Sequence, residues 1–137
     1  MTFEDSLSLL ASRVVTNWEQ TETEEATKTA FILPFISTVL GYDIFDPQEV
    51  IPEYTADIGV KRGEKVDYAI MGAGTVRMLI ECKKISGDLT PSHAGQLFRY
   101  FSVTNARIAI LTNGRQYNFY TDLEQPNKMD EKPFLVL

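Results

Sequence analysis

Three residues in the middle of the chain, Asp67, Glu81 and Lys83, have the types and spacing that metal-dependent phosphodiester hydrolysis requires. Glu81 and Lys83 are one residue apart at the end of an otherwise apolar run, where an unpaired charge would be costly. Side chains alternate between the two faces of a strand, so Glu81 and Lys83 are predicted to share one face while Cys82 points to the other. The pattern therefore predicts a polar patch at the end of a buried strand.

Asp67 reaches the same patch if the chain folds back on itself before Glu81. Residues 66–71 and 76–83 have the composition of strands, and the segment 72–75 between them favours a hairpin loop of three or four residues. If residues whose numbers have an even sum pair across this hairpin, Asp67 lies on the face of Glu81, directly opposite it or one diagonal away.

This cluster could bind a divalent cation beside a phosphate. Asp67 and Glu81 would supply hard oxygen ligands for Mg²⁺, for which Mn²⁺ would substitute, and the backbone carbonyl of Cys82 would add a further ligand. Lys83 would orient or deprotonate the attacking water, or neutralise the charge that develops on the phosphate.

The spacing alone has another explanation, a solvated strand face closed by ordinary ion pairs. An acidic residue two positions before a lysine is expected about once by chance in a chain of this composition and length. Asp130-Glu131-Lys132, in the polar tail, is such a chance occurrence. The apolar surroundings of Glu81 and Lys83 distinguish them from that triplet.

Two helices are expected before the hairpin. Apolar residues recur at helical spacing in the first of them, at Phe3, Leu7, Leu10, Val14 and Trp18. The second is predicted over residues 23–40, with Thr21 or Thr23 as its N-cap, a kink or break at Pro34 and Gly41 just past its end.

The remaining elements surround the hairpin in sequence. Residues 49–54 are predicted to form an edge strand because Pro52 cannot donate to a central ladder. A helix is predicted to begin after Thr90 and Pro91 and to reach about residue 103. Strands at 106–112 and 116–121 flank a turn at Asn113-Gly114.

These elements predict one α/β domain over residues 1–137, with a mixed or antiparallel central sheet flanked by helices. Its expected parts are an N-terminal helix in residues 1–22, a core in residues 23–122 and a tail in residues 123–137. Because residues 133–137 are apolar, the tail is expected either to dock on the sheet or to continue into a longer protein, and the second is favoured.

Composition limits the class of protein. The longest apolar run is too short and too interrupted to cross a bilayer, and the N-terminus has no secretory signal pattern. A single cysteine suits a reducing compartment, so the cytoplasm is the expected location. The net charge of −6 argues against a stand-alone nucleic-acid binder, although basic residues can still cluster locally.

Five segments together resemble a known family. They are residues 41–43, 57–70, 80–84, 96–101 and 110–114. In the same order they resemble the N-terminal nuclease domain of type I restriction enzyme R subunits and their short stand-alone relatives, and the resemblance extends from about residue 23 to residue 122. It implies a restriction-endonuclease-like PD-(D/E)XK fold and Mg²⁺-dependent cleavage of DNA, with Asp67, Glu81 and Lys83 in the family's motif.

The resemblance also assigns supporting residues. Gln96 and Tyr100, one helical turn apart, match the family's Gln-x-x-x-Tyr element. Glu24 matches an acidic residue on the first core helix, with its neighbour Glu25 leaving the register open. Val66 stands where the motif name has proline, a common departure in the superfamily.

The family resemblance also bears on partners. The chain has no Gly-x-x-x-x-Gly-Lys-Ser/Thr loop, so no nucleotide cofactor is expected and a motor or sequence-reading subunit would lie elsewhere. DNA, restriction-system subunits or a second copy of the chain are the expected partners.

Basic residues near the motif are candidates for contacts to the DNA backbone. The main candidates are Lys65, Lys84 and Arg99, and others nearby are Lys61, Arg62 and Arg107. Scattered surface charge is the alternative reading of this set. The rival function, from another class, is a non-catalytic DNA-binding or protein-docking module that keeps the nuclease fold.

Overall fold

A six-stranded mixed sheet forms the centre of the structure, a computed structural model that describes residues 2–56 and 64–137. The strands are adjacent in chain order: β1 (Val50–Tyr54), β2 (Val66–Gly72), β3 (Thr75–Cys82), β4 (Ile108–Thr112), β5 (Tyr117–Tyr120) and β6 (Leu135–Val136). Only β3 and β4 pair in parallel among these strands, and every other neighbouring pair is antiparallel. The predicted α/β fold with a mixed sheet is confirmed, and β1 forms an edge as expected.

The β2–β3 hairpin has a tighter turn than the sequence predicts. Its loop has two residues, Ala73 and Gly74, with φ values of 51° and 79°. Two positive φ values fit the twist of a two-residue hairpin turn, and glycine adopts them without strain. Beside the turn Gly72 is opposite Thr75, but the register shifts at the next residues, where Arg77 is the extra residue of a bulge.

The helical elements begin and end close to their predicted positions. In chain order they are α1 (Phe3–Asn17), a 3₁₀ turn (Trp18–Gln20), α2 (Glu24–Thr27), two π-helical turns (Lys28–Ile32 and Phe35–Val39), a second 3₁₀ turn (Pro91–Ala94) and α3 (Gly95–Val103). Thr23 rather than Thr21 is the N-cap of α2, because its hydroxyl accepts the N–H of Ala26 at 3.0 Å. Gly41, at φ 85°, follows the end of this helical segment as predicted.

Pro34 interrupts α-helical hydrogen bonding without ending the helical path. It has no N–H to donate, and its ring crowds the preceding turn. The wider π-helical turns lie directly before and after the Leu33-Pro34 step. Such turns are a recognised way for a helix to accommodate an interruption.

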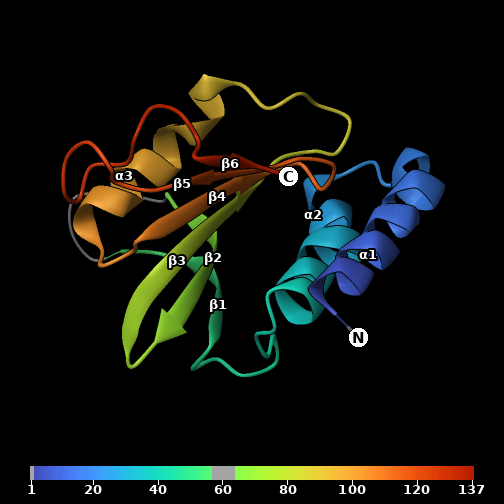
Figure 1. The fold of residues 1–137 in the computed structure, drawn as a ribbon, viewed down its shortest axis with the longest axis horizontal. Coiled ribbons are helices and arrows are strands. Elements are labelled where there is room, and N and C mark those ends of the chain that lie inside the picture. Colours follow the sequence, from blue (N-terminus) through green and yellow to red (C-terminus); the bar gives the residue numbers. More distant parts are fainter. Residues whose placement is uncertain (1, 57–63) are drawn as a thin grey trace.

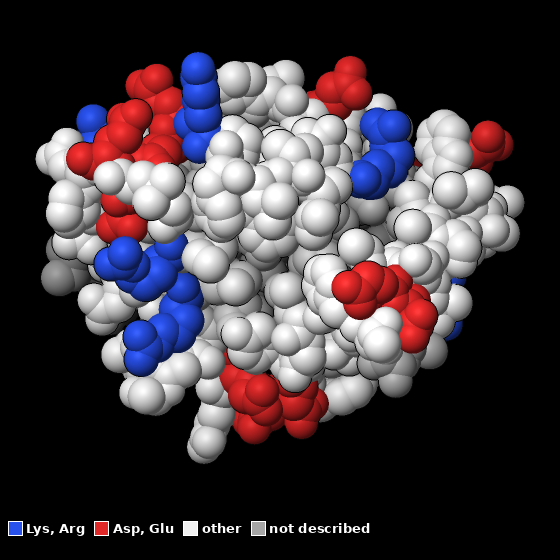
Figure 2. Space-filling model, viewed as in Figure 1, with Lys and Arg blue, Asp and Glu red and all other residues white. Residues whose placement is uncertain are grey.

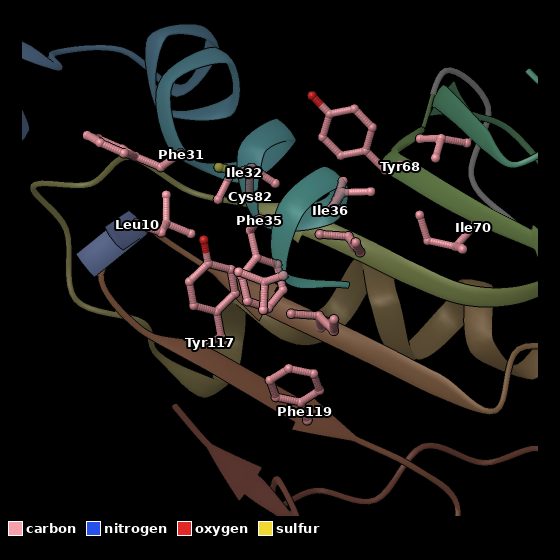
Figure 3. Packing of buried hydrophobic residues seen from close by; sticks show 14 of the residues in the cluster. Leu10, Phe31, Ile32, Phe35, Ile36, Tyr68, Ile70, Cys82, Tyr117 and Phe119 are labelled. Atoms are coloured by element: carbon pink, nitrogen blue, oxygen red, sulfur yellow. The ribbon is translucent and has the colours of Figure 1, made fainter. Parts of the chain in front are cut away.

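The helices cover both faces of the sheet (Figure 1). α1 and the helical segment that begins with α2 lie on one side, and α3 lies on the other. The first interface contains Ile32, Phe35 and Ile36 of the helical segment (Figure 3). Ile80 and Ile110 of the sheet belong to the same cluster. The second contains Leu97, Tyr100 and Phe101 of α3 against Leu79, Ala109 and Leu111. Ile80 of β3 thus packs in the first core and its neighbour Leu79 in the second, on opposite faces of the strand.

The C-terminal residues extend the sheet. Phe119 and Asn118 of β5 are opposite Leu135 and Val136 of β6, so these residues of the tail pair with the sheet. Among the described helices, none has the length and apolar character that a bilayer span requires.

Candidate functional site

The register of β2 and β3 brings Asp67 to Glu81. The last Cα pair of the ladder is Tyr68 opposite Ile80, so the next position along both strands sets Asp67 opposite Glu81. The even-sum pairing considered from the sequence is therefore the pairing in this part of the hairpin. A slip of one residue would turn Asp67 to the other face of the sheet.

At this end of the hairpin the two carboxylates replace backbone acceptors of the ladder. The Asp67 N–H donates to Oε1 of Glu81 at 3.1 Å, and the Cys82 N–H donates to Oδ2 of Asp67 at 2.7 Å. Each acidic side chain thus accepts from the opposite strand. These crossed hydrogen bonds hold both carboxylates side by side where the strands separate.

Glu81 is difficult to ionise in this position. It is only 5% exposed, and burial raises the pKa of Glu81, with the neighbouring Asp67 charge adding to the effect. Lys83 acts in the opposite direction, with its Nζ at 3.4 Å from Oε2 of Glu81. A cation bound at this carboxylate would favour its ionised form.

Lys28 is a site residue that the sequence reasoning missed. It starts the π-helical turn after α2, and its Nζ lies 2.7 Å from Oδ1 of Asp67 and 2.8 Å from Oε1 of Glu25. Burial alone would lower the pKa of Lys28, but hydrogen bonds and charges from Asp67 and Glu25 outweigh it and leave the pKa above its ordinary value. The available signal was a lysine in line with Phe31 and Ile32, on the face of the helix that is otherwise buried.

Both acidic residues of the first turn of α2 are near the site. Glu25 contacts Lys28 directly, whereas Glu24, the predicted supporting residue, acts on the thiol of Cys82. Burial raises the pKa of Cys82, and the charges of Asp67 and Glu24 add to it. Cys82 itself is fully buried in the core between the sheet and α2, as expected for a packing residue (Figure 3).

Helix α3 supports the chain just before Asp67. The Gln96 amide donates to the carbonyl of Lys65, and the Tyr100 hydroxyl donates to the carbonyl of Glu64 at 2.5 Å. Arg99 makes a two-pronged ion pair with the Glu64 carboxylate, with Nε at 3.0 Å from Oε1. Gln96 and Tyr100 therefore hold the backbone that enters β2.

The predicted DNA-contacting residues are in different environments. Lys65 and Lys84 are exposed, whereas Arg99 is paired with Glu64 and Arg107 with Asp122, at 3.2 Å. Lys61 and Arg62 lie outside the described residues. On the face drawn in Figure 2, blue atoms form one compact group at the lower left, and the other blue groups are separated from it by white and red atoms.

The donors at the strand ends suit a hard divalent cation. Asp67 and Glu81 offer carboxylate oxygens, and the Cys82 carbonyl is placed to join them. In an extended strand the N–H and C=O of one residue point to the same side. The Cys82 N–H donates to Asp67, so its carbonyl faces that side as well. An all-oxygen set of this kind favours Mg²⁺ or Mn²⁺ over softer metals.

A second acidic group, formed by Asp43, Asp46 and Glu49, has another explanation. The three residues bring carboxylate oxygens within 4.8 Å of one another. Their carboxylates cap the turns before β1: Asp43 accepts from the Phe45 N–H, Asp46 from the Gln48 N–H and Glu49 from the Asp43 N–H. Turn formation accounts for this group.

A cavity of about 570 Å³ lies between α1 and the C-terminal strands, away from the carboxylates. Its lining is mostly apolar and includes Leu10, Val14, Trp18, Tyr117 and Leu137. None of the described residues that line it is an aspartate or a glutamate, so the carboxylates at the strand ends remain the better candidate for a metal site.

The sequence of the whole chain was also compared with known proteins. The family described as type I restriction enzyme R protein N terminus matches residues 23–133, which is most of the 137-residue chain. No curated protein and no solved structure gives a significant match. The matched range contains every residue of the strand-end cluster.

Proposed function

Since this chain belongs to the family of type I restriction enzyme R protein N termini, we propose that it is a Mg²⁺-dependent DNA endonuclease domain of the PD-(D/E)XK type. It would act in the cytoplasm, within or beside a restriction or genome-defence system. The observation that carries the proposal is the cluster at the ends of β2 and β3, where Asp67, Glu81 and Lys83 lie together.

The residues of the cluster would have different roles in catalysis. Asp67, Glu81 and the Cys82 carbonyl would hold the metal, which would supply an activated water and stabilise negative charge on the phosphate. The crossed hydrogen bonds fix the two carboxylates before substrate arrives, so little ordering remains to be done on binding. Lys83, only partly buried, can leave Glu81 to contact the attacking water or a phosphate oxygen.

The net charge of −6 makes long-range attraction to DNA weak. Affinity would then come from local contacts by residues such as Lys65 and Lys84, or from a partner that carries the DNA. We therefore infer that other subunits, other domains or a second copy supply targeting.

One observation favours the rival, a non-catalytic module that keeps the fold. Lys28 already neutralises Asp67, so the cluster can persist as a purely structural ion-pair network. Metal binding by the wild-type protein separates the two readings, because a structural network has no need of a divalent ion.

Metal titration and DNA cleavage test the proposal together. By calorimetry, Asp67→Asn and Glu81→Gln should each lose Mn²⁺ binding, whereas Lys83→Met should keep it, because an ammonium cannot ligate a cation. All three should lose Mg²⁺-dependent cleavage of plasmid DNA, and an RNA substrate of equal length tests the preference for DNA.

Glu131→Gln is the matched control, since it alters the chance triplet in the tail and should leave binding and cleavage unchanged. Cleavage that survives Asp67→Asn would refute the assignment. Absence of metal binding by the wild-type chain would favour the non-catalytic module.

A further inference from the structure

The ammonium group of Lys28 contacts the carboxylate oxygen of Asp67 that faces the helix, at a position where a bound cation could lie. It comes from a different layer than Lys83, and its Nζ lies between Oδ1 of Asp67 and Oε1 of Glu25. We propose that Lys28 is the resident cation of this half of the site, so that the cluster accepts one divalent ion rather than two. This inference rests on the proposed function, because it concerns the metal content of the same site.

The two oxygens of Asp67 are used differently. Oδ2 accepts the N–H of Cys82 at 2.7 Å and faces the donors of β3, whereas Oδ1 accepts from Lys28 at 2.7 Å. On the α2 side, Asp67 and Glu25 together form a pair of carboxylates around one point. A small cation would be expected at that point if the ammonium were absent, because hard cations bind where several carboxylate oxygens converge.

Burial argues that this contact is more than a chance surface pair. The Lys28 side chain is 11% exposed and that of Asp67 is 17% exposed, so both charges have lost most of their water. A buried charge needs a partner of opposite charge, and Lys28 and Asp67 are partners of each other. Glu25, at 82% exposed, could turn to solvent at little cost, yet it contributes a second acceptor to Lys28.

The ammonium also limits what else Asp67 can bind. Because Nζ is 2.7 Å from Oδ1, a metal ligated by the same oxygen at the usual distance of about 2 Å would lie within about 5 Å of the ammonium. At an effective dielectric constant of about 20, the repulsion between a divalent ion and the ammonium at this distance weakens such binding by several orders of magnitude. Metal binding is therefore directed to Glu81, the Cys82 carbonyl and the Oδ2 side of Asp67.

The test counts Mn²⁺ ions bound per chain, with purified full-length protein at low ionic strength. Calorimetry and the paramagnetic resonance signal of free Mn²⁺ give stoichiometry and affinity without reference to DNA cleavage. Lys28→Met removes the charge and keeps an unbranched side chain, while Lys28→Arg keeps the charge. Lys28→Gln is a second neutral variant, whose amide can still donate to Asp67 if the methionine variant folds poorly. Lys128→Met is the matched control at an exposed lysine.

The expected result is one ion for the wild-type, Lys28→Arg and Lys128→Met proteins. The neutral variants should bind a second ion, because the positive charge that occupies its position has been removed. Adding Glu25→Gln to Lys28→Met should abolish the second ion, because that ion needs the Glu25 carboxylate.

Two results would overturn the inference: two ions in the wild-type protein, or the same number of ions in the wild-type protein and the neutral variants. Binding by the neutral variants alone would support the role of Lys28 while contradicting a metal-dependent wild-type nuclease. The failure of one proposal is thus distinguishable from the failure of the other.

Discussion

Replacing Glu81 with glutamine is expected to stabilise the metal-free protein at neutral pH, even though it removes a predicted metal ligand. Glu81 is 5% exposed, and burial followed by the Asp67 charge raises the pKa of Glu81 from 4.5 to about 8. Stability contributed by a group with a raised pKa is fully present below the unfolded value and is lost as the pH rises through the folded value. The neutral amide of glutamine avoids this loss.

The magnitude follows from the interval between the two pKa values. Between pH 4.5 and pH 7 the wild-type protein loses about 1.4 kcal/mol per pH unit, which amounts to about 3 kcal/mol at pH 7. The glutamine oxygen can still accept the Asp67 N–H, but the contact with Lys83 at 3.4 Å becomes weaker. The attraction of Lys83 for the ionised carboxylate already lowers the pKa of Glu81 and is therefore contained in this figure, so the expected gain at pH 7 is about 3 kcal/mol.

Urea unfolding in the presence of a chelator measures this gain. At pH 5 the unfolding free energies of the wild-type and Glu81→Gln proteins should differ by less than about 1 kcal/mol, and at pH 8 the variant should be more stable by about 4 kcal/mol. Asp67→Asn is the contrasting variant. It should lose stability at both pH values, because Asp67 accepts from Lys28 and from the Cys82 N–H. A Glu81→Gln protein that is no more stable at pH 8, or that gains equally at both pH values, would refute the electrostatic reasoning.

Three further outcomes are expected. Tyr100→Phe should lower the free energy of unfolding in urea by about 1 kcal/mol, because it removes the hydrogen bond to the Glu64 carbonyl. It should also slow cleavage without changing the affinity for Mn²⁺. An unchanged cleavage rate would show that the contact is only structural. Ile110→Ala should cost about 3 kcal/mol by the same measurement, since Ile110 is fully buried between the sheet and the α2 segment. Fluorescence anisotropy should show that the isolated chain binds DNA weakly and without sequence preference, and that its affinity falls steeply as salt is added. Tight, sequence-selective binding would mean that the domain selects its own target.

Most of the secondary structure could be predicted because local signals were strong and consistent. Element boundaries are marked by residues whose backbone chemistry depends on few neighbours. Thr23 and Thr90 precede helical elements, Gly41 follows one, and Asn113-Gly114 lies between two strands. The parallel pairing of β3 with β4 could only be expected in general terms. It depends on how α3 packs across the sheet, and that packing is a tertiary property.

The candidate site was predictable only where its contacts are local. Glu81 and Lys83 are neighbours on one strand, and strand alternation alone brings them together. The contact between Lys28 and Asp67 joins two layers, and no periodic pattern connects a helix residue with a strand residue at that separation. The same holds for Gln96 and Tyr100. Their spacing indicates a shared helix face, but it does not predict that they donate to the Lys65 and Glu64 carbonyls.

The bulge at Arg77 shows why the site needs more than a motif. Counted from the turn, where Gly72 is opposite Thr75, the pairing has an odd sum and would set Asp67 opposite Ile80, on the face away from Glu81. The extra residue restores an even sum before the strands reach the site. Arg77 is tied in place from both sides, because its Nε donates to the Gly72 carbonyl and its own carbonyl accepts the Arg107 N–H. The irregular end of the hairpin therefore determines whether the two carboxylates at its other end meet.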